Sequence, residues 1–128
     1  MPKKDISRKK LVSKLDTIFS RYIRLKDADS NGNCSCFTCG NIYHWKKIQA
    51  GHFQSRRHYS TRWCELNVKT QCAKCNLFSQ GEQYIFGIKL GKEVANKLYL
   101  QSKKTVKLSN MDLLEMIDDY SKKLKELV

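Results

Sequence analysis

The 128-residue chain carries 25 Lys and Arg against 12 Asp and Glu, a formal net charge of +13, so we expect a polyanionic partner, DNA above all. An anionic membrane is the competing partner, but no apolar run approaches the roughly 18 residues of a membrane span and no lipidation motif occurs, so membrane binding is disfavoured. The N-terminus also lacks the apolar core of a secretory signal, so we expect one cytoplasmic domain, in which cysteines are metal ligands before they are disulfides.

A basic amphipathic helix is predicted over residues 7–27, because apolar residues recur there at helical spacing. The apolar stripe consists of Leu11, Leu15, Ile18, Phe19, Tyr22 and Ile23. This stripe must dock on another part of the protein. The opposite face includes Arg21 and Arg24, and it is either simply solvated or in contact with DNA phosphates. Turn-forming residues over 27–33 end the helix.

Two Cys-x-x-Cys pairs mark residues 34–82 as a zinc-binding core. Four thiolates at this spacing can bind one structural Zn²⁺ as a tetrahedron. The predicted ligands are Cys36, Cys39, Cys72 and Cys75. Cys34 could exchange with Cys36, but the knuckle that ends in Gly40 has the better geometry. The remaining two, Cys34 and Cys64, are interpreted as a loop thiol and a small buried apolar residue.

Between the cysteine pairs the sequence predicts a hairpin, with a strand over 49–53, a loop over 54–62 and a second strand over 63–68. Residues 42–45 form a short strand or a loop, and His44 is interpreted as structural or surface-exposed. A helix that begins at Cys72 then presents the last two ligands. A knuckle, a hairpin and such a helix make a treble-clef arrangement.

The region 83–128 is expected to be helical. Helices are predicted over 82–90, with Gly91 as cap, and over 92–100, followed by an extended segment over 103–108. The run Ser109-Asn-Met-Asp112 resembles a capping box and opens a last helix to Leu127. The apolar face of this helix either closes the core or joins a second subunit, which leaves a homodimer open. The fold class is therefore α+β and mainly helical.

Three polar residues lie between or directly after the cysteine pairs and are our candidates for chemistry. His52 has an ordinary pKa close to working pH and suits a general base. Asn76 offers an amide oxygen to Mg²⁺ or Mn²⁺, and Asn67 would bond to loop backbone and hold the His52 strand in register. Each of them alone could be structural; their joint placement suggests phosphodiester hydrolysis.

Basic residues near these positions are expected to contact the DNA backbone. They are Arg56, Arg57, Arg62, Lys69, Lys74, Arg21 and Arg24.

The order of these segments resembles the HNH (ββα-metal) nucleases that carry a structural zinc, such as the endonuclease VII-like enzymes. A closer resemblance is to the phage NinG/Rap recombination endonuclease family. The segments concerned are residues 19–24, 36–40, 50–53, 62–67 and 71–76, with Tyr84 and Gly91. The resemblance implies a metal-dependent endonuclease for branched recombination intermediates (Holliday junctions, D-loops or forks), in the host cytoplasm. It implies His52 as general base, Asn76 as metal ligand and Asn67 as the middle asparagine.

One position departs from that pattern. Many HNH enzymes have a metal-binding aspartate directly before the histidine, where this chain has Gly51. The replacement ligand is Glu65 or His58, with Glu65 favoured because a carboxylate suits a hard cation, or the metal is held mainly by phosphate. Two other functions stay open: a zinc-stabilised DNA-binding recombination accessory or regulator without catalysis, and an RNA-binding zinc-ribbon protein.

Overall fold

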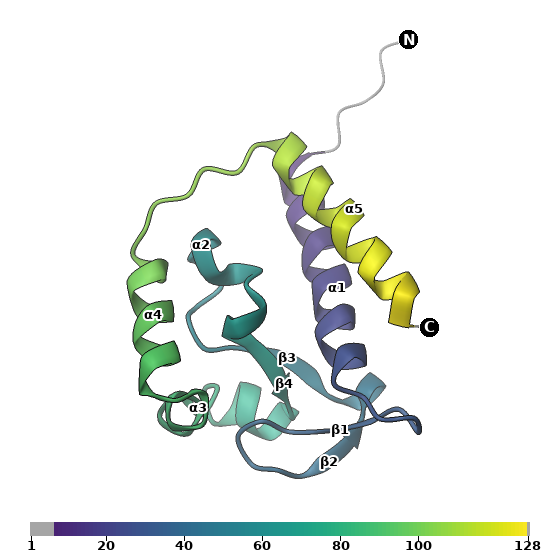
Figure 1. Cartoon of the computed structure of the whole chain (residues 1–128), viewed down its shortest axis with the longest axis vertical. Coiled ribbons are helices and arrows are strands. Elements are labelled where there is room, and N and C mark those ends of the chain that lie inside the picture. Colours follow the sequence, from purple (N-terminus) through teal and green to yellow (C-terminus); the bar gives the residue numbers. More distant parts are fainter. Residues whose placement is uncertain (1–6, 128) are drawn as a thin grey trace.

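The computed structural model describes residues 7–127, which form a mostly helical α+β fold with two small antiparallel sheets (Figure 1). The helices are α1 (Arg8–Lys26), α2 (Tyr59–Arg62), α3 (Gln83–Leu90), α4 (Lys92–Ser102) and α5 (Asn110–Leu127). The strands are β1 (Asn33–Ser35), β2 (Ile42–His44), β3 (Gln49–His52) and β4 (Val68–Gln71). Short helical turns cover η1 (Trp45–Lys47), η2 (Glu65–Asn67) and η3 (Lys74–Phe78).

The N-terminal helix forms where the apolar spacing predicts it. The hydroxyl of Ser7 accepts a hydrogen bond from the backbone N–H of Lys10 at 3.3 Å, which satisfies one of the free amides at the helix start. The helix ends at Lys26, directly before the run of turn formers. Its apolar stripe is therefore continuous over five turns and can bury one whole side of the helix.

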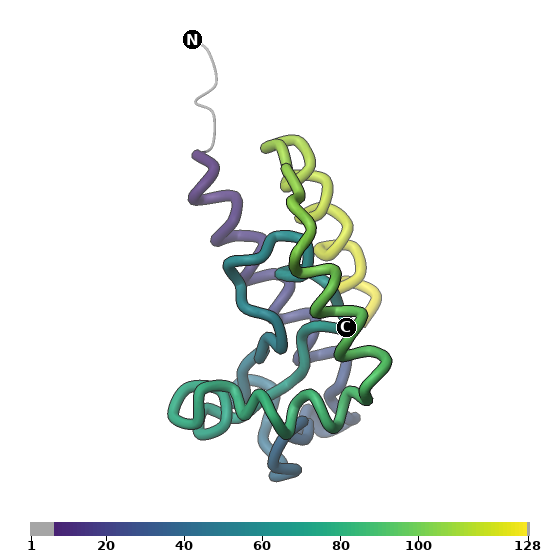
Figure 2. The backbone as a smooth tube through the Cα atoms, turned by 90° about the vertical axis from the view of Figure 1, so that its left-hand side faces the viewer, coloured from purple at the N-terminus to yellow at the C-terminus, as the bar shows by residue number. Residues whose placement is uncertain are grey.

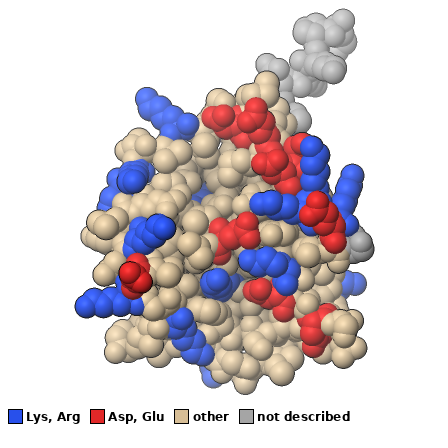
Figure 3. Space-filling view, in the orientation of Figure 1, with Lys and Arg blue, Asp and Glu red and all other residues tan. Residues whose placement is uncertain are grey.

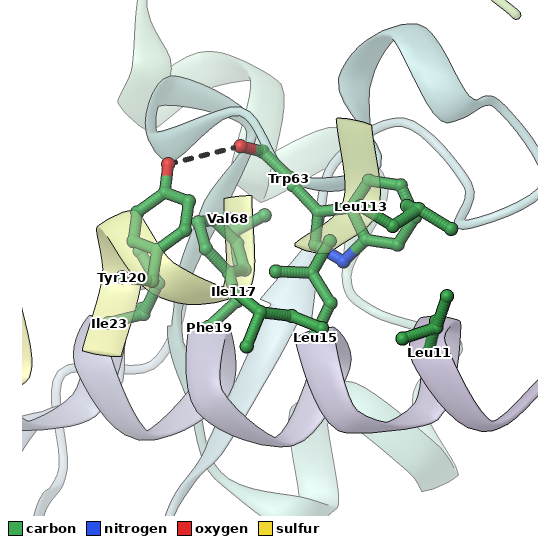
Figure 4. Packing of buried hydrophobic residues seen from close by; sticks show 9 residues of the cluster. All are labelled: Leu11, Leu15, Phe19, Ile23, Trp63, Val68, Leu113, Ile117 and Tyr120. Carbon is green, nitrogen blue, oxygen red and sulfur yellow. Dashed lines mark hydrogen bonds between the residues drawn. The ribbon is translucent and has the colours of Figure 1, made fainter. Parts of the chain in front are cut away.

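That stripe packs against α5, and Figure 1 shows the two helices side by side. The core they share with the second hairpin consists of Leu11, Leu15, Phe19, Ile23, Trp63, Val68, Leu113, Ile117 and Tyr120. Figure 4 shows the Tyr120 hydroxyl, which donates to the Trp63 carbonyl at 3.4 Å, at one end of this cluster. Of the two alternatives for the last helix, the structure shows that it closes the core.

The start of α5 confirms the predicted capping box. The backbone N–H of Ser109 donates to the carboxylate of Asp112 at 2.8 Å, and the N–H of Asp112 donates back to the Ser109 hydroxyl at 3.0 Å. Aspartate thus replaces the usual glutamate without loss of the reciprocal bonds. The guanidinium of Arg8 donates to the side chain of Asn110 at 3.3 Å, so α1 and α5 begin next to each other.

Both hairpins are antiparallel, and the second one differs from its predicted bounds. In β3–β4, His52 pairs with Val68 and Gln49 pairs with Gln71. The predicted strand over 63–68 is wrong, because residues 63–67 form a turn and the short helix η2. Side-chain bonds hold Trp63 and Asn67 at the two ends of this turn, so extended pairing begins only at Val68. The predicted loop over 54–62 also ends in the helix α2.

Charge is unevenly distributed over the surface. Figure 3 shows acidic and basic side chains interleaved on the side of α5, whereas Lys and Arg predominate on the opposite side of the same view. Within residues 7–127, no helix has both the length and the apolar character to cross a bilayer.

Candidate functional site

The four predicted zinc ligands form one cluster. The sulfur atoms of Cys36, Cys39, Cys72 and Cys75 all lie within 4.8 Å of one another, and the Cys39 and Cys72 sulfurs are 3.8 Å apart. Tetrahedral zinc with bonds of about 2.3 Å places its sulfur ligands about 3.8 Å apart. All four are free thiols, and a set of soft thiolates suits zinc. The cluster therefore fits one structural Zn²⁺.

Local backbone geometry brings the two pairs together. Gly40 has φ +81°, a left-handed conformation that closes the first knuckle, and its N–H donates to the Cys36 carbonyl at 2.9 Å. The N–H of Phe37 donates to the carbonyl of Thr70 at 2.7 Å, and the Thr70 hydroxyl donates to the Ser35 carbonyl at 2.7 Å. These bonds fasten the knuckle to β4, which leads directly into the second pair.

The protein environment shifts the pKa values of these thiols in different directions. Burial acts to raise the pKa of Cys36, but hydrogen bonds from the Thr38 hydroxyl and from backbone amides outweigh it and lower this pKa to about 6. Burial raises the pKa of Cys75 to about 12 and also raises that of Cys39. Four sulfurs this close cannot all be anionic without a cation among them.

The other two cysteines stand outside the cluster, in positions that reverse their interpretation. Cys34 lies in β1 with 4% of its surface exposed, so it is a buried strand residue and not a loop thiol. Cys64 is only half-buried. The choice of Cys36 over Cys34 as ligand agrees with the cluster.

A cleft of about 970 Å³ lies beside the cysteine cluster, and His52 and Asn76 both line it. Residues from α1, β3, η3 and the loops after β3 and η3 form its walls. The shared pocket for an imidazole and a carboxamide, which the spacing predicts, is therefore present. Of the predicted cationic residues, Arg24 and Arg56 also line it.

His52 is held in one tautomer. Its Nε2 lies 2.9 Å from the backbone carbonyl of Arg62, and a carbonyl only accepts, so Nε2 carries the proton and Nδ1 keeps the lone pair. Burial lowers the pKa of His52 to about 4, and the charge of Arg56 acts in the same direction. The imidazole is therefore neutral at pH 7, the state a base needs.

Asn67 makes the loop bonds expected from the sequence. It is fully buried; its amide nitrogen donates to the carbonyls of Gln54 and Thr61 at 3.1 and 3.0 Å, and its oxygen accepts from the Gln54 N–H at 2.7 Å. The backbone carbonyl of Asn67 also accepts from the Phe53 N–H at 2.8 Å. Asn67 does not line the cleft, so its geometry is that of a positioning residue.

Asn76 follows the last cysteine on the turn η3. Its amide nitrogen donates to the side-chain oxygen of Gln49 at 2.8 Å, so the amide oxygen keeps its lone pairs. Gln49 lines the same cleft and was missed by the sequence reasoning. An amide oxygen on each of these residues could bind a hard cation once the amide groups rotate.

The sequence reasoning also missed Asp16. It is the only acidic residue of α1, and it lines the cleft. Its carboxylate accepts from the Arg62 Nε at 3.1 Å and from the Trp63 indole N–H at 2.9 Å, and the Arg62 Nη2 binds its other oxygen. The sequence feature that could have pointed to Asp16 is that it is a single acid within an otherwise basic helix. Asp16 fixes the residue whose carbonyl holds His52.

The two candidate replacements for the missing aspartate lie elsewhere. Glu65 pairs with Lys26 at 3.3 Å and with Lys123 at 3.6 Å, and it does not line the cleft. His58 precedes α2 and borders a separate hollow of about 360 Å³ together with Arg57. Neither residue lines the cleft that Asn76 lines.

The predicted DNA-binding side chains fall into two groups. Arg21, Arg56, Arg57 and Lys74 are exposed and free to meet phosphate. The other three are partly buried and already have partners within the protein. Arg62 donates to the Asp16 carboxylate, and the Lys69 ammonium lies 5.7 Å from the centre of the Phe37 ring. Arg24 donates to the Trp45 carbonyl at 3.0 Å. Burial lowers the pKa of Arg24.

The neighbouring side chain of Gln71 leaves no room for an aspartate, or for any other side chain, at position 51. A Cβ on Gly51 would lie 1.8 Å from the side-chain oxygen of Gln71. Gln71 is fully buried, and its amide nitrogen donates to the Thr38 hydroxyl at 3.1 Å and to the Gly81 carbonyl at 2.8 Å. It cannot move aside without breaking both bonds.

We therefore expect Gly51→Ala to destabilise the protein by about 1–3 kcal/mol, as overpacking does. Truncation of the neighbour in the double variant Gly51→Ala/Gln71→Ala should make the glycine substitution nearly neutral relative to Gln71→Ala alone. Urea unfolding of the four proteins of this cycle measures the coupling. Equal costs of Gly51→Ala in both backgrounds would contradict the steric explanation.

Comparison with known proteins gives one family. The family model described as Bacteriophage Lambda NinG protein matches residues 3–128. No curated protein and no solved structure matches the chain. The match covers the first helix, the cysteine cluster, the cleft and the last helix together.

Proposed function

The chain belongs to the NinG family, which is associated with phage recombination, and from this premise we propose that it is a metal-dependent DNA endonuclease for branched recombination intermediates. The observation that carries the proposal is the placement of His52 and Asn76 in one cleft beside a four-cysteine cluster. We propose further that residues 34–82 are an HNH-like core, with β3–β4 and η3 as its hairpin and helix.

His52 is the proposed general base. Its Nδ1 lone pair takes a proton from water, the water oxygen forms a bond to phosphorus, and the bond from phosphorus to the 3′-oxygen breaks; the released 3′-oxygen then takes up a proton from solvent. The HNH resemblance implies 5′-phosphate and 3′-hydroxyl products. The imidazole is neutral at pH 7, as a general base must be, but its pKa near 4 makes it a weaker base than a histidine with the ordinary pKa of about 6.5.

Asn76, with Gln49 beside it, is the proposed site for Mg²⁺ or Mn²⁺. A divalent cation, when bound, would offset the negative charge that develops on the phosphate oxygens. Both side chains line the cleft and offer amide oxygens, the hard ligands that such cations prefer. With few protein ligands, the affinity for metal should rise strongly when DNA phosphate is present.

A direct test compares a four-way junction, a fork and a linear duplex, each end-labelled, with and without Mg²⁺ or Mn²⁺. We expect metal-dependent cuts near the branch of the first two and little cutting of the duplex. Absence of cleavage of all three in either metal, with binding retained, would favour the DNA-binding accessory or regulator instead.

Asp16 should matter to this reaction although it holds no substrate. We expect Asp16→Asn to weaken the hold on Arg62, release the Arg62 carbonyl from His52 and lower cleavage by roughly 10-fold or more, with a stability loss of about 1–3 kcal/mol. Long-range ¹H–¹⁵N spectra of the His52 ring measure the change directly, as a mixture of tautomers.

The matched control is Asp118→Asn, which removes the same charge from an exposed pair with Lys122 on α5 and should leave stability and cleavage nearly unchanged. If Asp16→Asn keeps the parent's single His52 tautomer, Asp16 does not position the base.

A further inference from the structure

Two consecutive apolar side chains are exposed on the turn η3. Leu77 has 60% and Phe78 has 82% of its surface exposed, directly after Asn76. A soluble protein gains nothing in stability from a neighbouring leucine and phenylalanine in water. Such a pair on a functional turn indicates a contact surface for another molecule.

The backbone presents this pair rigidly. The N–H groups of Asn76, Ser79 and Gly81 donate to carbonyls of residues 72, 74 and 75 at 2.9, 2.9 and 2.7 Å, so the turn is tied to the cysteine cluster. Gln80 and Glu82, on either side of Gly81, have φ of +51° and +49°, a strained left-handed conformation. Strain of this kind and π-type turns are frequent at functional sites. Figure 2 shows the teal-green turn projecting at the lower left of the backbone.

The pair adjoins the cleft. Leu77 lines the cleft together with Asn76, and Phe78 is the next residue. One residue spans at most about 3.6 Å and one step of stacked bases about 3.4 Å, so both side chains lie within about two nucleotides of a phosphate bound at Asn76. We call Leu77 and Phe78 the apolar edge.

The charges around the apolar edge suit a nucleic acid better than a second copy of the chain. Lys74 is exposed on the same turn, and Arg56 is exposed in the cleft. The acid that lines the cleft, Asp16, is already paired with Arg62. Two copies with a net charge of +13 each would repel at such a surface, whereas a polyanion is attracted.

We propose that the apolar edge packs against unstacked bases at the branch point of DNA. A branch exposes base faces that a linear duplex keeps stacked, and Phe78 can stack on such a face while Leu77 fills the gap beside it. The inference rests on the proposed function only for its branched DNA partner. Selectivity for branched DNA then resides in this edge, and cleavage resides in the cleft.

The test measures binding without cleavage, with Ca²⁺ in place of Mg²⁺. A junction and a fork carry 2-aminopurine at the branch, and a linear duplex of the same length is the reference. We expect Phe78→Ala to weaken binding to branched DNA by roughly 5- to 150-fold, the range measured for loss of one aromatic–base stack, and to abolish the fluorescence change. Binding to the duplex should change by less than about 2-fold, because phosphate contacts remain.

Phe78→Trp should retain both signals, and Ile42→Ala, which truncates an equally exposed apolar residue on β2, should have no effect. Equal losses on branched and linear DNA would overturn the inference, as would an unchanged fluorescence signal in Phe78→Ala. A parent that sediments as a dimer and becomes monomeric in Phe78→Ala would assign the edge to a second copy instead. If the stacking signal is present but no DNA is cut in Mg²⁺ or Mn²⁺, the endonuclease proposal fails and this inference stands.

Discussion

Replacement of His52 by alanine is expected to lower the rate of junction cleavage by roughly 10²–10⁴-fold, the usual contribution of a general base. The reason lies in the geometry: the Arg62 carbonyl holds the Nε2 proton, which leaves Nδ1 as the acceptor on a ring that lines the cleft. Junction binding should change little, because the ring carries no charge at pH 7 and phosphate contacts come from other residues. Single-turnover cleavage and binding in Ca²⁺ measure the two effects separately.

The same histidine predicts the pH dependence. With a pKa of about 4 the imidazole loses its proton well below neutrality, so cleavage should rise as pH increases through about 4 and level off before pH 7. A profile that still rises through pH 6–7 would point to a different base or to an unshifted histidine.

Folding stability should also fall as the pH is lowered. The folded pKa lies below the unfolded value of about 6.5, so the unfolded chain binds the extra proton and the contribution of His52 is lost as pH falls from about 6.5 to about 4. The matched control for the cleavage rate and for its pH dependence is His58→Ala. His58 lies outside the cleft, so this variant should cleave DNA like the parent. If His52→Ala cuts as fast as His58→Ala, the base is assigned to the wrong residue.

Removal of zinc is expected to unfold the region that carries the cleft. A structural Zn²⁺ typically contributes about 10–16 kcal/mol of binding free energy, which is comparable to the whole stability of a domain, about 5–15 kcal/mol. Cys72→Ser, or chelation of the parent, should therefore lose the folded near-UV circular dichroism signal. Metal analysis should give one zinc per parent chain and none in the variant.

Cys64→Ser is the control for this experiment, because Cys64 is half-buried and lies outside the cluster. It should bind one zinc and melt within a few degrees of the parent. A chain that keeps its melting temperature after chelation, with zinc absent, would show that the cysteine cluster is not a structural metal site.

Much of the architecture was predictable because it depends on residues near one another in the sequence. The helix over 7–27, the capping box at Ser109 and the helix end at Gly91 follow from local spacing and local hydrogen bonds. The cysteine ligands were predictable for a related reason, since a metal needs its ligands in close pairs. From these pairs the shared position of His52 and Asn76 also followed.

The tertiary structure decided what depends on residues far apart in the sequence. Asp16, on α1, binds Arg62, and the side chain of Gln71 fills the space next to Gly51. Glu65 forms ion pairs with Lys26 and Lys123 instead of lining the cleft. No periodicity records such contacts, because they exist only once α1 and α5 have packed around the second hairpin. The sequence alone therefore determined which residues could bind zinc and accept a proton, and packing determined which neighbours hold them in place.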